Sequence, residues 1–305
     1  MRTLDVVGFG ALNLDEILRV PRVLLNDETV VEEHLSAPGG SAANTVYALA
    51  KLGARTGFIG AVGDDEAGQV LLRDLREGDV DTTGVKAKSG SRSGRVLAIT
   101  DRQGQRALYV EPGANDTLAQ EDVDLSYACA TRFLHLSSFA GDVQLDLQKW
   151  LVSKLPDSVR VSFAPGALYA KKGLDALSPI LNKTYVLFAN QQEIEELAGM
   201  EYRAAARNLI GQGCTIVAVT SRSGSHIVGS GNEYTIESAA VEHPTDTTGA
   251  GDAYAAGFLY GLLLGKGLEE CGRLGDLTAR FCITGMGARA GLPTEAQLLE
   301  AYKKS

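Results

Sequence analysis

The sequence has little cysteine, no excess of basic residues and no long apolar run, and each absence excludes a class of protein. The four cysteines are Cys129, Cys214, Cys271 and Cys282. Their wide spacing lacks the paired pattern of metal sites, so we expect buried, reduced thiols and a cytoplasmic location. The net charge of −9 argues against a nucleic-acid or membrane-surface binder. No apolar run reaches the roughly 18 residues of a membrane span.

Glycine, in contrast, is abundant, with 35 residues, which implies many backbone turns. The shares of hydrophobic residues (45%) and charged residues (22%) are ordinary for a globular protein. A chain of 305 residues can bury a sizeable core, and α/β folds of this size are often one domain. The chain shows no long linker, low-complexity tract or internal repeat, so we expect a single domain over residues 1–305.

Short apolar, β-branched runs alternate with helical patterns, which is typical of βαβ units. The predicted strands are Leu4–Gly8, Thr56–Ala61, Arg132–Leu136, Val159–Phe163, Tyr185–Ala189 and Ile216–Thr220. One predicted helix is Ala42–Leu52, closed by Gly53 at the C′ position. Another is Glu66–Glu77, followed by Gly78. The pattern predicts an α/β fold with a single doubly wound, mostly parallel sheet flanked by helices.

Two regions interrupt this alternation and indicate antiparallel hairpins. Leu14–Leu35 and Ser93–Glu111 each contain two extended segments around a polar turn. Together they predict a small β-sheet lid inserted in the domain, with lid segments at about 14–37 and 93–112. Such a sheet can cover a site or bury its apolar face against a second subunit, so a homodimer through the lid is expected.

The most informative motif is Asp246-Thr247-Thr248-Gly249-Ala250-Gly251-Asp252, which leads directly into an apolar segment. It predicts a glycine-rich turn at a helix start, where free N–H groups and the helix dipole bind anions. The same turn carries a carboxylate. Phosphoryl transfer needs charge stabilisation on the moving group and a base for the acceptor hydroxyl, and this turn could supply both. The structural alternative is a tight turn in which Asp246 or Asp252 interacts favourably with the helix dipole.

A second glycine motif, Gly8-Phe9-Gly10-Ala11-Leu12-Asn13, begins like a dinucleotide fingerprint. Asn13 stands where that fingerprint needs Gly or Ala for close packing, so an NAD-dependent enzyme is disfavoured. Asn13 and Asp15 instead follow the first strand, at the end of an α/β sheet where ligands usually bind, and their side chains suit hydroxyl groups. The alternative for these two residues is an Asx turn.

A polar, glycine-containing segment also opens the helix after the first hairpin. Gly39 and Gly40 allow the backbone to approach a ligand closely, and Asn44 offers both a donor and an acceptor. The alternative is that Ser41 is simply the N-cap of this helix.

Asn190 follows a predicted strand and stands three residues before Glu193. This spacing is typical of a capping box, in which the two residues satisfy the first N–H groups of a helix. A functional interpretation has the same side chains holding the waters of a magnesium ion that bridges nucleotide phosphates. Both interpretations hold together only if the Glu193 carboxylate faces the cleft.

The order of these motifs resembles the ribokinase-like (PfkB) family of ATP-dependent sugar and nucleoside kinases over nearly the whole chain. The motifs are Asn13-x-Asp15, Gly39-Gly40-x-x-x-Asn44, Gly63-x-Asp65-x-x-Gly68, Asn190-x-x-Glu193 and Asp246-Thr247-x-Gly249-Ala250-Gly251-Asp252. The resemblance implies one α/β domain with a β-sheet lid. It also implies transfer of the γ-phosphoryl group of ATP to a hydroxymethyl group of a sugar or nucleoside.

The resemblance assigns expected roles to single residues. The catalytic base would be Asp252, with an anion hole formed by Gly249, Ala250 and Gly251. The acceptor would be held by Asn13, Asp15, Gly39, Gly40 and Asn44. The nucleotide would be held by Asn190, Glu193, Thr220, Ser221 and Gly224, within an adenine-binding region at Thr220–Ser225 and Gly285–Gly291. The expected cofactors are ATP, Mg²⁺ held by Glu193 through water, and K⁺ beside Asp246 and Thr248.

Departures from the family pattern leave the acceptor open. The turn Ser221–Ser225 lacks a glycine common in relatives, and Ala164 replaces an Asp or Asn. No glutamate of the ribokinase type stands near Ser137, which favours a nucleoside kinase as an alternative. A catalytically silent, ligand-binding family member is another. A phosphorylated acceptor is a third, with its phosphate meeting Arg92, Arg95 or Arg106.

Overall fold

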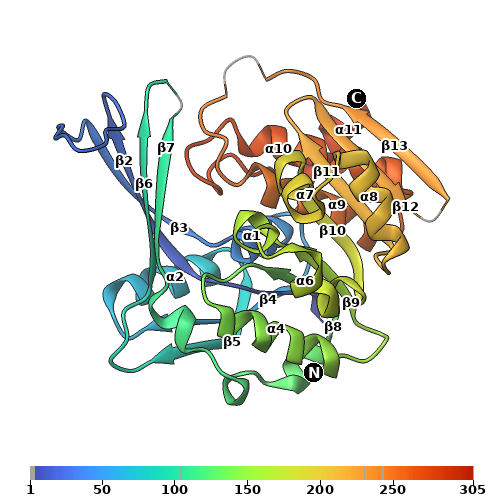
Figure 1. The fold of residues 1–305 in the computed structure, drawn as a ribbon, viewed down its shortest axis with the longest axis horizontal. Helices are drawn as coiled ribbons and strands as arrows, with labels where there is room; N and C mark the ends of the chain where they lie inside the picture. The colour runs from blue at the N-terminus through green and yellow to red at the C-terminus, as the bar shows by residue number, and fades with distance from the viewer. Residues whose placement is uncertain (1–3, 104, 230, 242–243, 305) are drawn as a thin grey trace.

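The computed structural model describes residues 4–103, 105–229, 231–241 and 244–304, and for Arg106 the backbone alone. The main sheet contains β1 (Leu4–Phe9), β4 (Thr56–Gly63), β5 (Val80–Lys88), β8 (Thr131–Ser137), β9 (Arg160–Ala164), β10 (Thr184–Asn190), β11 (Ile216–Ser221), β12 (Gly224–Gly229) and β13 (Asn232–Glu237). Within the described residues its strand order is β13-β12-β11-β10-β9-β8-β1-β4-β5 (Figure 1). The pairs from β5 to β11 are parallel, and β12 and β13 add an antiparallel edge.

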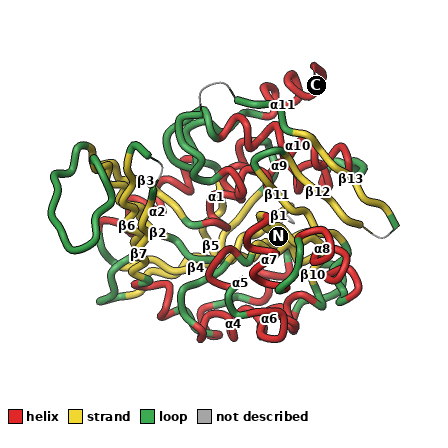
Figure 2. Tube along the Cα trace, turned by 45° about the horizontal axis from the view of Figure 1, so that its top comes forward, coloured by secondary structure: helices red, strands yellow, loops and turns green. Residues whose placement is uncertain are grey.

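Helices cover both faces of this sheet (Figure 2). They are α1 (Ser41–Lys51), α2 (Glu66–Glu77), α3 (Leu125–Cys129), α4 (Asp142–Lys154), α5 (Gly166–Ala170), α6 (Gly173–Leu181), α7 (Gln191–Ala198), α8 (Tyr202–Gly211), α9 (Ala250–Leu263), α10 (Leu268–Cys282) and α11 (Glu295–Lys304), with 3₁₀ turns η1 (Gly113–Thr117) and η2 (Gln120–Asp122). One apolar core joins the sheet to α4, α6, α7 and α8, and a second joins it to α1, α2, α9, α10 and α11. The predicted doubly wound fold is confirmed.

Helix α2 has the predicted bounds and is followed by Gly78, and α1 begins and ends one residue earlier than predicted. Gly53 has φ +86° just after α1, as expected of a C′ glycine. Gly78 is the C-cap of α2 with φ −86°, and the left-handed residue is Asp79, with φ +59°. An Asp tolerates this conformation better than most side chains because it can hydrogen-bond locally.

The predicted hairpins form a separate four-stranded sheet, here called the lid, from β2 (Asn13–Val20), β3 (Glu33–Gly39), β6 (Gly94–Asp101) and β7 (Arg106–Glu111). Its order is β3-β2-β6-β7. Each hairpin is antiparallel, and β2 and β6 join the two in parallel. Figure 1 shows the lid projecting from one side of the main body.

Helix α9 carries the glycine-rich motif into the core. Its residues Ala253 to Gly261 are all buried, because α9 packs against α1, α10 and strand β10. A helix that is apolar all round is stable only inside such a core. Its buried position fixes its N-terminus at the carboxyl ends of β10 and β11, where ligands bind in open α/β sheets. In the described part of the chain, no helix is both long and apolar enough to cross a bilayer.

Candidate active site

The turn before α9 has the geometry of an anion site. Gly249 is the N-cap with φ +78°, and no described side chain caps the helix. A Cβ atom on Gly249 would lie 2.5 Å from the Cβ of Ala288, so only glycine fits there. A Cβ atom on the exposed Gly251 would meet no heavy atom within 4 Å. The first turn of α9 therefore borders open space at Gly251.

Asp252, in the first turn of α9, is held by two residues of α1. Ser41 Oγ donates to Asp252 Oδ1 at 2.6 Å, and Asn44 Nδ2 donates to Asp252 Oδ2 at 2.9 Å. The alternative that Ser41 is an N-cap is wrong, because Gly40 occupies that position and no side chain caps α1. Both carboxylate oxygens are thus oriented by side chains from another helix.

Burial raises the pKa of Asp252 to about 6, opposed by the hydrogen bonds from Ser41 and Asn44. The nearby carboxylate of Glu193 raises this pKa further, and Arg289 lowers it. A carboxyl group with a pKa near 6 is largely ionised at neutral pH and accepts protons better than an ordinary aspartate. This is the property that a general base requires.

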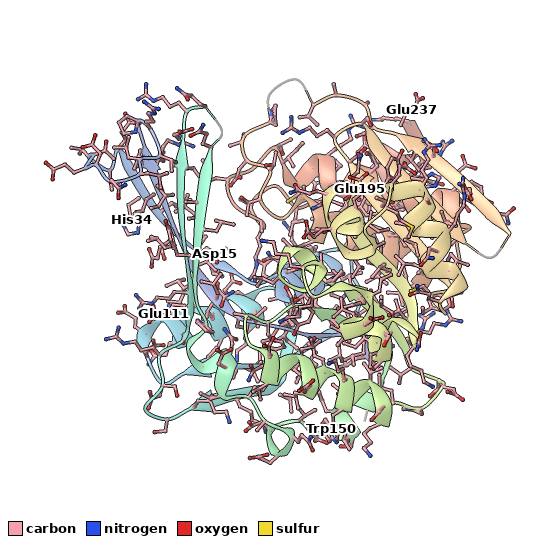
Figure 3. The ribbon with its side chains drawn as sticks, viewed as in Figure 1. Asp15, His34, Glu111, Trp150, Glu195 and Glu237 are labelled. Carbon is pink, nitrogen blue, oxygen red and sulfur yellow. The ribbon has the colours of Figure 1, made fainter. Side chains whose placement is uncertain are left out.

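Asp15 lies on β2, where the lid meets the body (Figure 3). Gly39, its neighbour on β3, makes room for it, because a Cβ atom there would lie 2.2 Å from Asp15 Oδ2. Gly40 has φ +108°, and a Cβ atom there would clash with the carbonyl oxygen of Ala11. Both positions therefore require glycine. Burial raises the pKa of Asp15 to about 7, with Arg289 opposing and Asp252 adding to the rise.

Asn13, which was expected to hold the acceptor, instead makes a contact within the protein. Its side chain is buried, and its Oδ1 accepts a hydrogen bond from Asn115 Nδ2 at 3.0 Å. Asn115 also accepts from Leu12 N and donates to Leu12 O. Asn115 is a residue that the sequence analysis missed, and it holds the end of β1 to the start of the lid. An acceptor contact from Asn13 stays a prediction.

Four of the five predicted nucleotide residues line one cavity of about 960 Å³, and Glu193 is not among its lining residues. Its lining includes Asn190, Thr220, Ser221 and Gly224 together with Ala250 and Gly251 of the anion turn. Ser221 pairs with Gly224 across a two-residue hairpin turn, so the unusual Ser221–Ser225 segment is a tight β-turn between β11 and β12. The cavity therefore ends beside Asp252.

Asn190 and Glu193 form the predicted capping box of α7. Asn190 Oδ1 accepts from Glu193 N at 2.9 Å, and Asn190 N donates to Glu193 Oε2 at 3.0 Å. Burial raises the pKa of Glu193, and its carboxylate in turn raises the pKa of Asp252. Glu193 therefore caps the helix, and a contact from its carboxylate to the cleft stays a prediction.

The donor set of this cleft fits a magnesium–nucleotide complex. No three His, Cys, Asp or Glu side chains of the described residues converge as a metal cage. Magnesium usually binds through one or two carboxylates, waters and substrate phosphates, which is what Glu193 and the uncapped start of α9 offer.

Asp246 joins two loops beside the anion turn. Its Oδ1 accepts from Thr248 N at 2.9 Å and from Thr248 Oγ1 at 2.8 Å, and its Oδ2 accepts from Gly287 N at 2.9 Å. These contacts hold the 285–291 stretch against the start of α9. A monovalent-cation site at Asp246 and Thr248 stays a prediction.

Arg289 is a second residue that the sequence analysis missed. It lies in the stretch Gly285–Gly291, assigned above to the adenine, yet the structure places it on the acceptor side. Its Nε donates to Asn44 Oδ1 at 3.0 Å, it pairs with Asp74 of α2, and it stacks 4.8 Å from the centre of the Tyr47 ring. Arg289 is 245 residues from Asn44 along the chain, so no local pattern indicates the contact.

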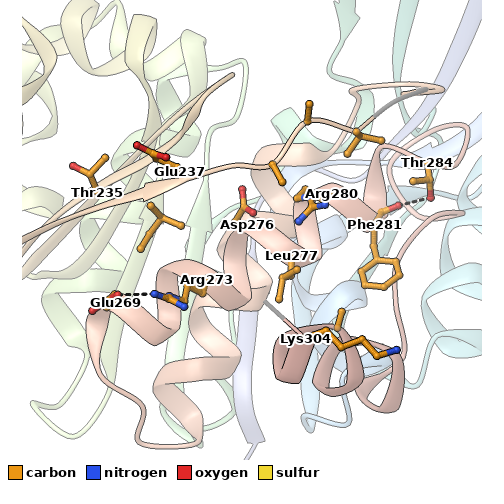
Figure 4. A pocket seen from close by; sticks show the side chains of 15 residues that line it. Thr235, Glu237, Glu269, Arg273, Asp276, Leu277, Arg280, Phe281, Thr284 and Lys304 are labelled. Carbon is orange, nitrogen blue, oxygen red and sulfur yellow. Dashed lines mark hydrogen bonds and ion pairs between the residues drawn. The ribbon is translucent and has the colours of Figure 1, made fainter.

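A second, larger hollow of about 1090 Å³ adjoins the nucleotide cavity (Figure 4). It lies between β13, α10 and α11, and the two cavities share Ala240, Val241, Asp276 and Arg280. Its lining includes no residue of the anion turn, whereas the smaller cavity is lined by Ala250 and Gly251. The smaller cavity is therefore the one that adjoins the anion turn.

A buried carboxylate at a helix start without a side-chain cap, beside a nucleotide-sized cavity, is an arrangement suited to phosphoryl transfer to an alcohol group. The model described as "pfkB family carbohydrate kinase" matches residues 3–295, and the chain belongs to this family. It is an ATP-dependent sugar or nucleoside kinase of the ribokinase type.

Individual relatives agree with this assignment. An uncharacterized sugar kinase of Archaeoglobus fulgidus is 45% identical over 249 residues, covering 80% of this chain and 98% of the relative. An ATP-dependent ribose-1-phosphate kinase of Halopiger xanaduensis is 32% identical and covers 90% of this chain and 91% of its own. The crystal structure of a ribokinase from Thermotoga maritima is 25% identical with a TM-score of 0.86, covering 99% of this chain and 100% of that one.

Proposed function

We propose that the protein transfers the γ-phosphoryl group of ATP to a hydroxymethyl group of a neutral sugar or nucleoside. The observation that carries this proposal is the position of Asp252, which is held by Ser41 and Asn44 at the end of the nucleotide cavity. An acceptor hydroxyl between Asp15 and Asn44 would lie against this base. The free N–H groups of α9 would face the phosphoryl group from the other side.

In the proposed reaction Asp252 orients the hydroxyl group and accepts its proton as the new O–P bond forms. The N–H groups at Gly249–Gly251 stabilise the charge that develops on the transferred group. Mg²⁺, when bound, neutralises the phosphate oxygens, and we assign its waters to Asn190 and Glu193. The lid carries Asp15 onto the acceptor and excludes water that would otherwise replace it.

Local charge favours a neutral acceptor. Asp15 and Asp252 border the pocket, while the nearby positive charge of Arg289 is already paired with Asp74. Arg95 is opposite Leu14 in the β2–β6 register, so it lies on the lid face that points away from Asp15. The side chain of Arg106 is outside the described part of the structure. Since one relative is a ribose-1-phosphate kinase, the test must still include a phosphorylated acceptor.

The structure does not strengthen the narrower nucleoside-kinase alternative. Ser137 is buried, and its Oγ accepts a hydrogen bond from Ala42 N at 3.0 Å. Its small size therefore serves the anchoring of α1 and does not enlarge an acceptor pocket. A cytoplasmic location stays a prediction, with which the four free cysteines agree.

The proposal is tested by measuring ADP formation with ribose, fructose, adenosine, cytidine and ribose 1-phosphate, each with ATP, with and without Mg²⁺ and K⁺. We expect Mg²⁺-dependent turnover that is highest with one of the neutral acceptors. A preference for ribose 1-phosphate would overturn the neutral-acceptor assignment. No ADP above the acceptor-free background with any compound would overturn the proposed function.

Replacing Asp15 by Asn should raise the KM for the acceptor by about ten- to a hundredfold, since a hydrogen bond to a charged group contributes about 1.5–3 kcal/mol. The KM for ATP should change less than twofold. Glu16→Gln is the matched control, because Glu16 bonds His34 on the opposite lid face and should leave both constants unchanged. A defect confined to ATP binding would contradict the assigned role.

We further propose that the lid mediates a homodimer. Leu35, Leu108 and Val110 share the face of Asp15 by strand register and are 36%, 52% and 43% exposed. A single-layer sheet with such a face needs a partner layer, and a second copy supplies one by symmetry.

Leu108→Glu should therefore convert a dimer into a monomer in sedimentation velocity. Tyr109→Glu, which places the same charge on the opposite lid face, should leave the dimer intact. A wild-type chain that stays monomeric at high protein concentration would refute the dimer.

A further inference from the structure

Arg289 is buried between α1 and α2 with 9% of its side chain exposed. Two of its three guanidinium nitrogens are paired, Nε with Asn44 and Nη1 with Asp74. Its Nη2 is buried and has no hydrogen-bond partner among the described residues. Buried guanidinium groups are usually fully paired, because an unsatisfied charged donor is costly. The unpaired nitrogen therefore indicates a partner that the protein itself does not supply.

Asp15 presents the complementary atom. Its Oδ1 is also buried and lacks a partner within the described part of the chain. The charge of Arg289 lowers the pKa of Asp15, so the two groups lie near each other, and each has a buried polar atom without a partner in the described part of the chain. A hydroxyl group can donate to a carboxylate and accept from a guanidinium at the same time. One hydroxyl of a bound acceptor would satisfy both atoms.

Arg289 also acts on the base through Asn44. The amide oxygen of Asn44 accepts from Arg289 Nε, and the amide nitrogen donates to Asp252 Oδ2. Because the guanidinium can only donate, it selects the amide orientation in which the NH₂ group faces Asp252. Asp74, Arg289, Asn44 and Asp252 thus form one chain of contacts from α2 through α1 to α9.

We propose that Arg289 is a positioning and specificity-determining residue of the acceptor site. It fixes Asn44 against Asp252 and, together with Asp15, binds one hydroxyl group of the acceptor. This inference rests on the proposed function, since it concerns the acceptor of that reaction. It adds a residue outside the sequence motifs to the acceptor site.

The test compares Arg289→Gln and Arg289→Lys with the control Arg160→Gln. Arg160 stacks 4.5 Å from the centre of the Tyr185 ring on the main sheet and has no recorded contact with the described acceptor residues. The acceptor is the neutral compound with the highest turnover in the screen, used with its monodeoxy analogues, for example 2-deoxyribose for ribose or 2′- and 3′-deoxycytidine for cytidine.

Arg289→Gln should lower kcat/KM for the acceptor by about a hundredfold, leave the KM for ATP within twofold and lose discrimination against one deoxy analogue. Its acidic pH limb should move to higher pH, because Arg289 lowers the pKa of Asp252. Arg289→Lys should recover part of the rate, since it keeps the charge but not the fork of donors. Arg160→Gln should match the wild type in all these measurements.

A purely structural role would lower the melting temperature and leave the pH limb and the deoxy discrimination unchanged, and this result would overturn the inference. If Arg289→Gln does not fold, Asp74→Asn takes its place, because it keeps the guanidinium but removes its anchor and should cause a smaller loss of kcat/KM and of deoxy discrimination. The increase in melting temperature on binding of the acceptor provides a readout that does not need turnover. Equal stabilisation of the wild type and the variant would refute the binding role, even for a chain that forms no ADP.

Discussion

Replacing Asp252 by Asn should lower kcat by about a thousandfold, within the range of general-base catalysis, and change the KM for ATP little. The amide keeps the shape of the carboxylate but cannot accept the proton of the acceptor hydroxyl. The predicted nucleotide residues Thr220, Ser221 and Gly224 line the cavity from other elements, so the substitution should leave them in place. Initial rates at saturating ATP and acceptor measure the effect, and a near-normal rate would exclude Asp252 as the base.

Two controls separate this chemical effect from damage to the fold. Burial raises the pKa of Asp252 to about 6, so the wild-type rate should rise with pH through that value as the carboxyl ionises, and the residual rate of the variant should lack this limb. The raised pKa also means that the ionised carboxylate destabilises the folded protein as pH increases from about 4 to 6. The variant should therefore melt at or above the wild-type temperature at pH 7, and a large decrease would point to misfolding instead.

Gly249→Ala should lower kcat by about a hundredfold and also lower the melting temperature. The residue has φ +78°, and the new Cβ atom would lie 2.5 Å from the Cβ of Ala288. Relief of that clash must move the start of α9, and with it the N–H groups that we propose to face the phosphoryl group. Loss of one such donor in other enzymes costs about a hundred- to a thousandfold in kcat.

Gly265→Ala is the matched control, because Gly265 follows the other end of α9 with φ +72° and its Cβ position is free of contacts. It should show the cost of a left-handed alanine, about 1–2 kcal/mol, with normal kinetics. Steady-state rates and thermal melts of both variants show whether Gly249 affects the reaction or the stability of the fold alone. Equal kinetics in the two variants would mean that the turn at Gly249 serves stability alone.

The sequence predicted the parts of the site that are local in the chain. The turn at Gly249–Asp252 and the capping box at Asn190 and Glu193 depend on neighbouring residues, so their geometry can be inferred from short patterns. The central strands were also predicted, because they are buried on both faces. Strands β5, β12 and β13 were not among the predictions. The edge strands β5 and β13 are partly exposed and lack a continuous apolar run, and β12, although buried, is a short segment that contains glycine, serine and histidine.

Long-range contacts could not be predicted in this way. Asn115 bonds Leu12 across 103 residues and Arg289 bonds Asn44 across 245, and neither lies in a recognisable motif. Gly39 was expected to let a ligand approach, but its missing side chain makes room for Asp15. The glycine at position 39 was informative in the sequence. Its neighbour Asp15, which requires a glycine there, could not be identified, because the contact depends on the register of β2 and β3.

The lid strand β3 ends at Gly39, and Ser41 begins α1 and donates to Asp252, so only Gly40 separates the lid from a hydrogen-bond partner of Asp252. With φ +108°, Gly40 cannot carry a side chain without strain. In the lid closure proposed above, Gly40 would be the hinge, and rotation of β3 would be transmitted to Ser41. An open enzyme would hold its proton acceptor less firmly than a closed one, which ties readiness for reaction to the presence of an acceptor and protects ATP from hydrolysis in its absence.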